Sequence, residues 1–163
     1  MKYFYDTEFI ENGPSEPIYF MSIGIVSEDG REYYAENSGC PLDRANDWVK
    51  ANVIPHLGSV TKQNRYDIKR DVEDFMDIQK YGKPELWGYY ADYDHVVFSQ
   101  LFGRMVDLPV GFPMYTNDLK QLVKSMGNPR LPAQGKDEHH ALKDAQWIKA
   151  CYDRLQTVTV VSP

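Results

Sequence analysis

Apolar and aromatic side chains gather in three short runs in the first third of the chain. They cover Met1–Asp6, Pro17–Ser27 and Arg31–Asn37. Runs of this length that are rich in Tyr, Phe, Ile and Val are typical of β-strands. Asp29-Gly30, between the second and third runs, is a turn signal for a β-hairpin. The first third therefore predicts three strands, of which the second and third are joined as a hairpin.

Further along the chain, apolar positions recur every three or four residues, which places them on one face of a helix. Ile68, Val72, Phe75 and Met76, for example, share such a face. The pattern predicts helices at Asp43–Val53, Asn64–Gln79, Asp94–Phe102, Thr116–Met126 and His140–Leu155, a strand at Glu85–Tyr90, a loop or short strand at Leu108–Pro113, and a short strand or loose tail at Thr157–Pro163. Strands followed by alternating helix and strand predict an α/β fold with a mixed sheet flanked by helices.

Length and composition predict a single domain that spans residues 1–163. Hydrophobic residues make up 42% of the chain and charged residues 26%, as in a folded globular domain with a sizeable core. Cys40 and Cys151 lie in no metal-ligand spacing, so we expect two free thiols in a reducing cytoplasm. The N-terminal segment has acids and no long apolar region, so we expect no signal peptide. No stretch of the sequence approaches the roughly 20 apolar residues that span a membrane, so we expect no membrane span.

The candidate chemistry begins with Asp6 and Glu8, which follow the first apolar run directly. Residues two apart in a strand point to the same face, so both carboxylates are expected to converge at the strand end. Two negative charges held together are unfavourable unless a cation neutralises them. Carboxylate oxygens suit Mg²⁺ or Mn²⁺. Alone, however, this pair is also typical of a solvated turn.

Two later segments add to the pair. Asp94 opens a predicted helix after the strand at 85–90, where it could also be a simple N-cap. His139 and Asp144 stand at the start of the last helix. Five residues turn a regular helix by about 140°, so the two side chains can face one site only if His139 lies in the loop before the helix.

These residues occur in the order Asp, Glu, Asp, His, Asp, which resembles the DEDDh group of 3′-5′ exonucleases. The resemblance is carried by His139-x-Ala141-x-x-Asp144 and by the Tyr93-Asp94 step. The chain is also similar to the mycobacterial RNase AS family from Lys2 to about Leu155. The segments that show this similarity are Lys2–Glu11, Ile23–Ala35, Tyr93–Val96 and Pro129–Pro132.

The resemblance implies an RNase H-like fold and a hydrolase that removes nucleoside 5′-monophosphates from RNA 3′ ends, with a preference for poly(A). It implies two Mg²⁺ ions, for which Mn²⁺ could substitute. Asp6 would bridge both ions, Glu8 and Asp144 would complete the shell of the first, and Asp94 would hold the second. His139 would be the general base. Such enzymes form homodimers.

The net charge of −6 argues against RNA binding along a broad basic surface. A site that holds only the last few nucleotides remains compatible with it. Five residues close to the acids are candidate substrate contacts, namely Thr7, Phe9, Ile10, Glu11 and Tyr93. Aromatic side chains could stack on bases and Glu11 could contact the ribose hydroxyls, which would favour RNA over DNA. Phe9 and Ile10 could equally pack in the core.

Several alternatives remain open from the sequence. His140 competes with His139, because it lies four residues before Asp144 on the same helical face. Asp92, two residues before Asp94, is a second candidate for the role of Asp94. The substrate could be single-stranded DNA or both nucleic acids. The chain could also be a catalytically silent module that binds nucleic acid, although such modules usually lack one of the five residues, and all five are present here.

Overall fold

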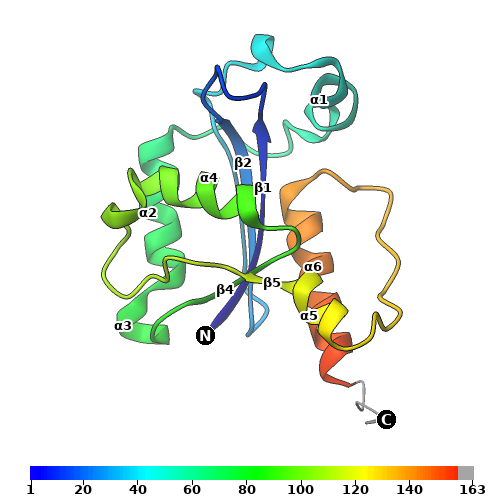
Figure 1. Ribbon diagram of the computed structural model, residues 1–163. Helices are drawn as coiled ribbons and strands as arrows, with labels where there is room; N and C mark the ends of the chain where they lie inside the picture. Colours follow the sequence, from blue (N-terminus) through cyan, green and yellow to red (C-terminus); the bar gives the residue numbers. More distant parts are fainter. Residues whose placement is uncertain (158–163) are drawn as a thin grey trace.

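The computed structural model describes residues 1–157, and a mixed sheet of five strands runs through their centre (Figure 1). The strands are β1 (Lys2–Ile10), β2 (Tyr19–Ser27), β3 (Glu32–Glu36), β4 (Glu85–Gly88) and β5 (Asn117–Asp118). Their order is β3-β2-β1-β4-β5. β1, β2 and β3 pair antiparallel, whereas β4 and β5 are parallel to β1. The predicted α/β fold is confirmed, and the arrangement is consistent with an RNase H-like sheet.

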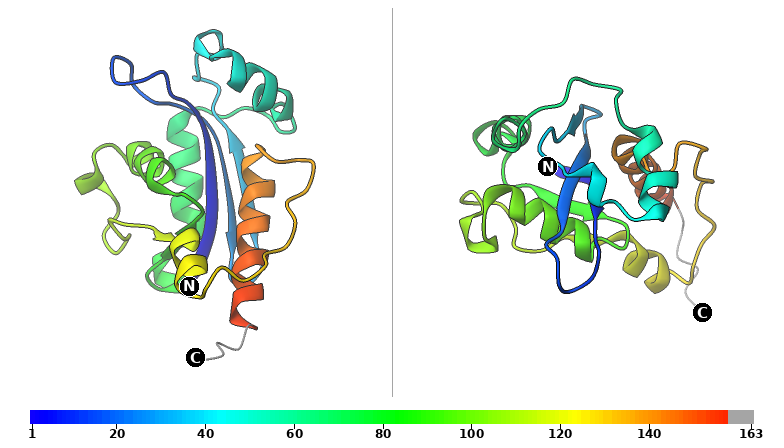
Figure 2. Two further views of the ribbon diagram at one scale, coloured as in Figure 1. Left: turned by 45° about the vertical axis from the view of Figure 1, so that its right-hand side comes forward. Right: turned by 90° about the horizontal axis from the view of Figure 1, so that it is seen from above.

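Helices cover both faces of the sheet (Figures 1 and 2). The α-helices are α1 (Asp47–Asn52), α2 (Arg65–Met76), α3 (Ile78–Tyr81), α4 (Asp92–Phe102), α5 (Leu119–Ser125) and α6 (Ala141–Gln156), and short 3₁₀ helices are η1 (Leu42–Arg44), η2 (Ile54–His56) and η3 (Met105–Asp107). α2 and α4 lie on one face, α5 and α6 lie on the other, and α1 lies at the end of the sheet where β1 ends, on the side of α6 (Figures 1 and 2).

Side chains of β1 alternate between these two faces. Tyr3 and Tyr5 are fully buried in the core under α2 and α4. Phe4 points the other way, into the core beneath α5 and α6. Asp6 and Glu8 follow the same alternation as Phe4, so they project toward the face that α6 covers.

The main difference from the sequence prediction is the length of β1. The strand continues to Ile10 instead of ending at Asp6, so the two acids lie within the strand. It continues because Asp6 pairs with Gly24 and Glu8 pairs with Ser22 on β2. On its other side β1 pairs with β4 only from Lys2 to Phe4. The second half of β1 is therefore an open edge, with backbone N–H groups available to other partners.

Three predicted helices begin or break differently. The helix expected at 43–53 is divided into η1 and α1, because Asn46 is extended and its side chain accepts a hydrogen bond from Val49 N at the start of α1. The helix expected at 64–79 stops at Met76, because Asp77 is non-helical and caps α3. The helix expected to begin at Thr116 begins at Leu119 instead, because Asn117 and Asp118 form the short strand β5 and Asp118 caps α5.

The remaining predictions concern shorter segments. Residues 108–113 form a loop. Of the strand or tail predicted at 157–163, residues 158–163 lie outside the part of the chain that the structure describes. None of the helices within residues 1–157 is long and apolar enough to cross a membrane.

Candidate active site

A cavity of about 370 Å³ opens beside the free edge of β1. It brings together residues from β1, α1, α4 and the start of α6. Its lining includes all five residues that the sequence singled out, namely Asp6, Glu8, Asp94, His139 and Asp144, together with Thr7, Phe9, Glu11, Asn46, Trp48, Val49 and Val53. Residues from positions 6 to 144 thus meet at one place.

Asp94 is held against the open edge of β1. It belongs to the first turn of α4 but caps no backbone N–H with its side chain. Instead its Oδ1 accepts two hydrogen bonds from Thr7, one from the backbone N at 2.9 Å and one from Oγ1 at 2.6 Å. The Thr7 N–H is free to donate because β4 has already ended at Gly88. The short β4 strand therefore makes room for the carboxylate of Asp94 next to Asp6 and Glu8.

His139 and Asp144 have the arrangement that their spacing requires. His139 lies in the loop before α6, with a left-handed backbone (φ 70°), and Asp144 lies in the first turn of the helix. The backbone N of His139 donates to Asp144 Oδ2 at 2.9 Å, and Gln134 Nε2 donates to Oδ1 at 2.6 Å. The His139 ring meets the Trp48 ring edge to face, with centroids 4.9 Å apart. Both side chains are thus oriented by specific neighbours.

Gly24 allows α6 to approach the sheet this closely. It lies on β2 opposite Asp6. A Cβ atom at this position would be 2.3 Å from the backbone N and Cα of Leu142 and 2.4 Å from the carbonyl carbon of Ala141. The first turn of α6 therefore rests on the bare glycine backbone, which brings Asp144 over the acids of β1.

The four carboxyl groups in the cavity all have raised pKa values. Burial, and after it the charges of Asp144 and Asp94, raise the pKa of Glu8 to about 8. Burial and the charges of the other three acids raise the pKa of Asp6 well above its ordinary value. Burial also raises the pKa of Asp94, to about 6, even though the hydrogen bonds from Thr7 oppose the rise. The pKa of Asp144 is raised by burial as well. The cluster therefore needs protons or cations to balance its charge.

The donor set fits a divalent cation. Among the described residues, Glu8, His139 and Asp144 each offer a ligand atom, and these atoms lie within 4.8 Å of one another. Asp6 and Asp94 add carboxylate oxygens to the same cavity. Oxygen-rich sites of this kind suit hard cations such as Mg²⁺ or Mn²⁺.

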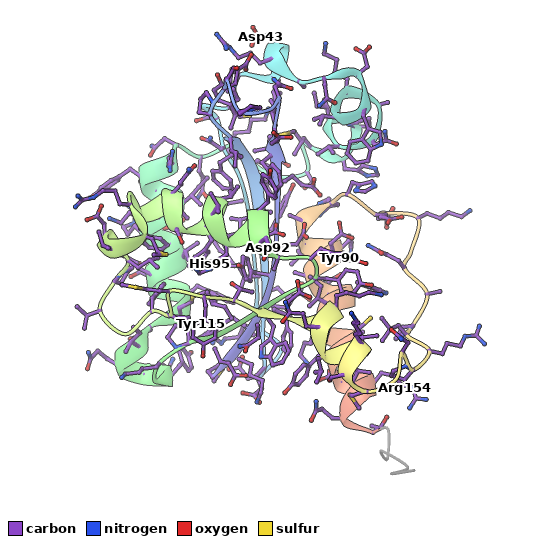
Figure 3. All side chains as sticks on the ribbon, viewed as in Figure 1. Asp43, Tyr90, Asp92, His95, Tyr115 and Arg154 are labelled. Atoms are coloured by element: carbon purple, nitrogen blue, oxygen red, sulfur yellow. The ribbon has the colours of Figure 1, made fainter. Side chains whose placement is uncertain are left out.

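The two rivals occupy different surroundings. Asp92 is exposed and lines a separate cavity with His95 and Tyr115 (Figure 3). His140 is stacked on Tyr34, with ring centroids 4.4 Å apart, and does not line the acidic cavity. The structure thus groups Asp94 and His139 with the acids and leaves Asp92 and His140 apart from them.

The candidate substrate contacts also divide. Glu11 and Phe9 line the cavity, and the Phe9 ring is stacked on the half-exposed Tyr93 with centroids 5.8 Å apart. Thr7 lines it too, but its hydroxyl is committed to Asp94. The prediction that Ile10 contacts the substrate is wrong. Its side chain is fully buried in the core between the sheet and α1, where it cannot reach a ligand.

Two residues that contact His139 or Asp144 could not be predicted from the sequence. Trp48 is 56% exposed on α1 and faces His139. Its sequence signal is weak, an aromatic residue among the polar residues of a short helix. Gln134 lies in the loop before α6 and has no motif around it. Both are brought to the site by tertiary structure.

Comparisons with known proteins show what the whole chain is similar to. The model of the family described as the 3′-5′ exoribonuclease Rv2179c-like domain matches residues 1–156. The 3′-5′ exoribonuclease Rv2179c of Mycobacterium tuberculosis (strain ATCC 25618 / H37Rv) is 44% identical over 149 residues, which cover 90% of this chain and 88% of that protein. The 3′-5′ exoribonuclease MT2234.1 of Mycobacterium tuberculosis (strain CDC 1551 / Oshkosh) matches with the same identity and coverage.

Proposed function

The chain belongs to the Rv2179c-like family of 3′-5′ exoribonucleases, and we propose that it hydrolyses RNA from the 3′ end by the chemistry of the DEDDh group. The observation that carries this proposal is the convergence of four carboxylates and His139 in one cavity. We also propose, from the resemblance to the RNase AS family, a preference for poly(A) and a cytoplasmic homodimer of single-domain subunits.

Two divalent cations, Mg²⁺ or in its place Mn²⁺, complete the proposed site. Asp6, Glu8 and Asp144 would hold one ion, and Asp94 with Asp6 would hold the other. When bound, such cations neutralise charge around the phosphate and make water more acidic. The raised pKa values of Glu8 and Asp94 support this assignment, because these acids lack cationic neighbours in the cavity lining.

His139 is the proposed general base. In its neutral form it would accept a proton from the attacking water, whose oxygen bonds to phosphorus while the bond to the O3′ of the preceding nucleotide breaks. That O3′ leaves as a hydroxyl, with a proton taken from solvent water. His139 lies beside Glu8 and Asp144 and could itself offer a ligand atom, but we assign it to the attacking water because the carboxylates already supply the oxygen ligands that Mg²⁺ prefers. The loop position of His139 supports this role, because Asp144 fixes its backbone and Trp48 limits how far its ring can turn.

The 3′-terminal nucleotide is proposed to occupy the same cavity. The stacked pair of Phe9 and Tyr93 offers an aromatic surface to its base. Glu11 lines the cavity and is assigned to the ribose hydroxyls. Contact with the 2′-hydroxyl would favour RNA over DNA.

The test is cleavage of 5′-labelled oligo(A), oligo(U), oligo(C) and oligo(dA) with Mg²⁺, Mn²⁺ or a chelator. We expect a metal-dependent ladder that shortens from the 3′ end, fastest on oligo(A) and slower on oligo(dA). Equal ladders on all RNAs would remove the poly(A) preference. A ladder on oligo(dA) as fast as on oligo(A) would remove the assignment to RNA. No ladder with either metal would contradict the enzymatic proposal and favour a binding module.

A further inference from the structure

A second cavity lies on the other side of the same acids. It has a volume of about 290 Å³ and shares Asp6, His139 and Asp144 with the first. Three of its other lining residues are aromatic, namely Tyr89, Tyr90 and Trp147, and the rest are Gln134, Glu138 and Ile148. The two cavities therefore meet at the acidic cluster, and each extends away from it in its own direction.

Tyr90 is the most unusual residue of this second cavity. It lies on the loop between β4 and α4, on the side where α6 begins (Figure 3). Its backbone is left-handed, with φ 55°, a conformation that costs a bulky residue free energy and is usually given to Gly or Asn. Its side chain is 64% exposed, so burial of the ring does not explain the choice of tyrosine.

The surroundings of Tyr90 hold it in this position. The next residue, Ala91, donates its N–H to Asp118 Oδ2 at 3.1 Å, which fixes the loop to the start of α5. The Tyr90 ring meets Tyr89 edge to face, with centroids 4.8 Å apart. Tyr89 in turn packs against Trp147, with centroids 5.0 Å apart.

Trp147, on the α6 side of the cavity, is also held in place. Trp147 Nε1 donates to the Pro132 carbonyl at 3.1 Å. Lys120 Nζ lies 5.9 Å from the centre of the Tyr90 ring, so a positive charge accompanies the exposed aromatic surface. An aromatic face beside a lysine is the combination that single-stranded nucleic acids bind, by base stacking and by phosphate contact.

We propose that this second cavity binds the penultimate nucleotide of the RNA, with Tyr90 as the stacking surface for its base. The inference rests on the proposed function. A scissile phosphate over Asp6, His139 and Asp144 has a nucleoside on each side. When the terminal nucleoside occupies the first cavity, the upstream nucleoside is directed into the second.

This assignment predicts what the second cavity does for specificity. Stacking accepts every base, because every base has an aromatic face. Tyr90 therefore contributes affinity for a strand of RNA but does not select adenine. The choice of base would be made in the first cavity.

The experiment compares two 5′-labelled oligo(A) substrates, one intact and one with an abasic ribose at the penultimate position. We expect Tyr90→Ala to lower kcat/KM on the intact substrate by about tenfold, the equivalent of one base stack of ~1.4 kcal/mol. On the abasic substrate Tyr90→Ala should match the wild type, since there is no base to stack. Tyr90→Phe should match the wild type on both substrates, because it keeps the ring.

Tyr66→Ala is the matched control, since Tyr66 is 72% exposed on α2 and lines neither cavity. It should change neither rate. An equal loss on both substrates in Tyr90→Ala, or no loss on either, would overturn the inference while the nuclease assignment stands. A wild-type protein that cleaves neither substrate would overturn the proposed function and this inference with it.

Discussion

Gly24→Ala tests whether the closeness of α6 to the sheet builds the site. The added Cβ would lie 2.3 Å from the backbone N and Cα of Leu142. Ordinary carbon contacts lie at about 3.5 Å or more, so the first turn of α6 has to move by about 1 Å. The atoms in the way belong to the backbone, so no change of side-chain rotamer can relieve the clash.

That movement would displace Asp144 and His139 relative to Asp6. A misplacement of about 1 Å at a reacting centre costs roughly 10²-fold in rate. Overpacking of this kind also destabilises a protein by about 1–3 kcal/mol, and each kcal/mol lowers Tm by roughly 2–4 °C at this chain length. Gly24→Ala is therefore expected to fold, to melt a few degrees lower and to lose most of its activity.

The assay is kcat/KM on 5′-labelled oligo(A) together with thermal unfolding followed by circular dichroism. Gly39→Ala is the control, because a Cβ there would lie 3.4 Å from its nearest neighbour, Asn37 Oδ1. It should retain both activity and Tm. A Gly24→Ala protein with wild-type kcat/KM and Tm would refute the reasoning.

Three further predictions concern residues of the first cavity. Thr7→Val removes the Oγ1 donor from Asp94, so the pKa of that carboxyl, about 6, should rise further. Loss of a hydrogen bond to a charged group costs ~1.5 kcal/mol, so the Mg²⁺ concentration for half-maximal activity should rise about tenfold. An unchanged Mg²⁺ titration would contradict this. Burial and neighbouring acids raise the pKa of Glu8 from 4.5 to about 8 in the folded protein, so its contribution to stability without cations is full below about pH 4.5 and is lost as the pH rises through 8. Mg²⁺ should therefore raise Tm by several degrees more at pH 8 than at pH 5, and equal shifts would count against a cation site. His139→Ala should lower kcat by roughly 10²–10⁴ and His140→Ala by less than tenfold, and the reverse order in a direct comparison would move the base to His140.

The hydrophobic pattern predicted the sheet better than it predicted where β1 ends. The apolar run stops at Asp6, but the strand continues because β2 offers partners at Gly24 and Ser22. Strand length here depends on a neighbour that a local pattern does not contain. Asn46 and Asp77 broke predicted helices for a related reason, since each forms side-chain hydrogen bonds to backbone N–H groups that begin a new helix.

The site could be predicted as far as motifs reach. The spacing of His139 and Asp144 required a loop before the helix, and the structure has that loop. Ile10 shows the limit, because only the packing of α1 decides whether an apolar residue beside the acids meets the cavity or the core. Trp48 and Gln134 come from distant parts of the chain and carry no signature of their own, so tertiary structure alone places them at the site.

The measurement that tests the central claim most directly is single-turnover cleavage of 5′-labelled oligo(A) by the wild type and by Asp6→Asn in Mg²⁺. The substitution keeps the size of the side chain and removes one negative charge from the acidic cluster. We expect the wild type to produce a ladder from the 3′ end that disappears on chelation, and Asp6→Asn to cleave at a rate at least roughly 10²-fold lower. Wild-type turnover by Asp6→Asn would contradict the assignment of these acids to cation-dependent hydrolysis.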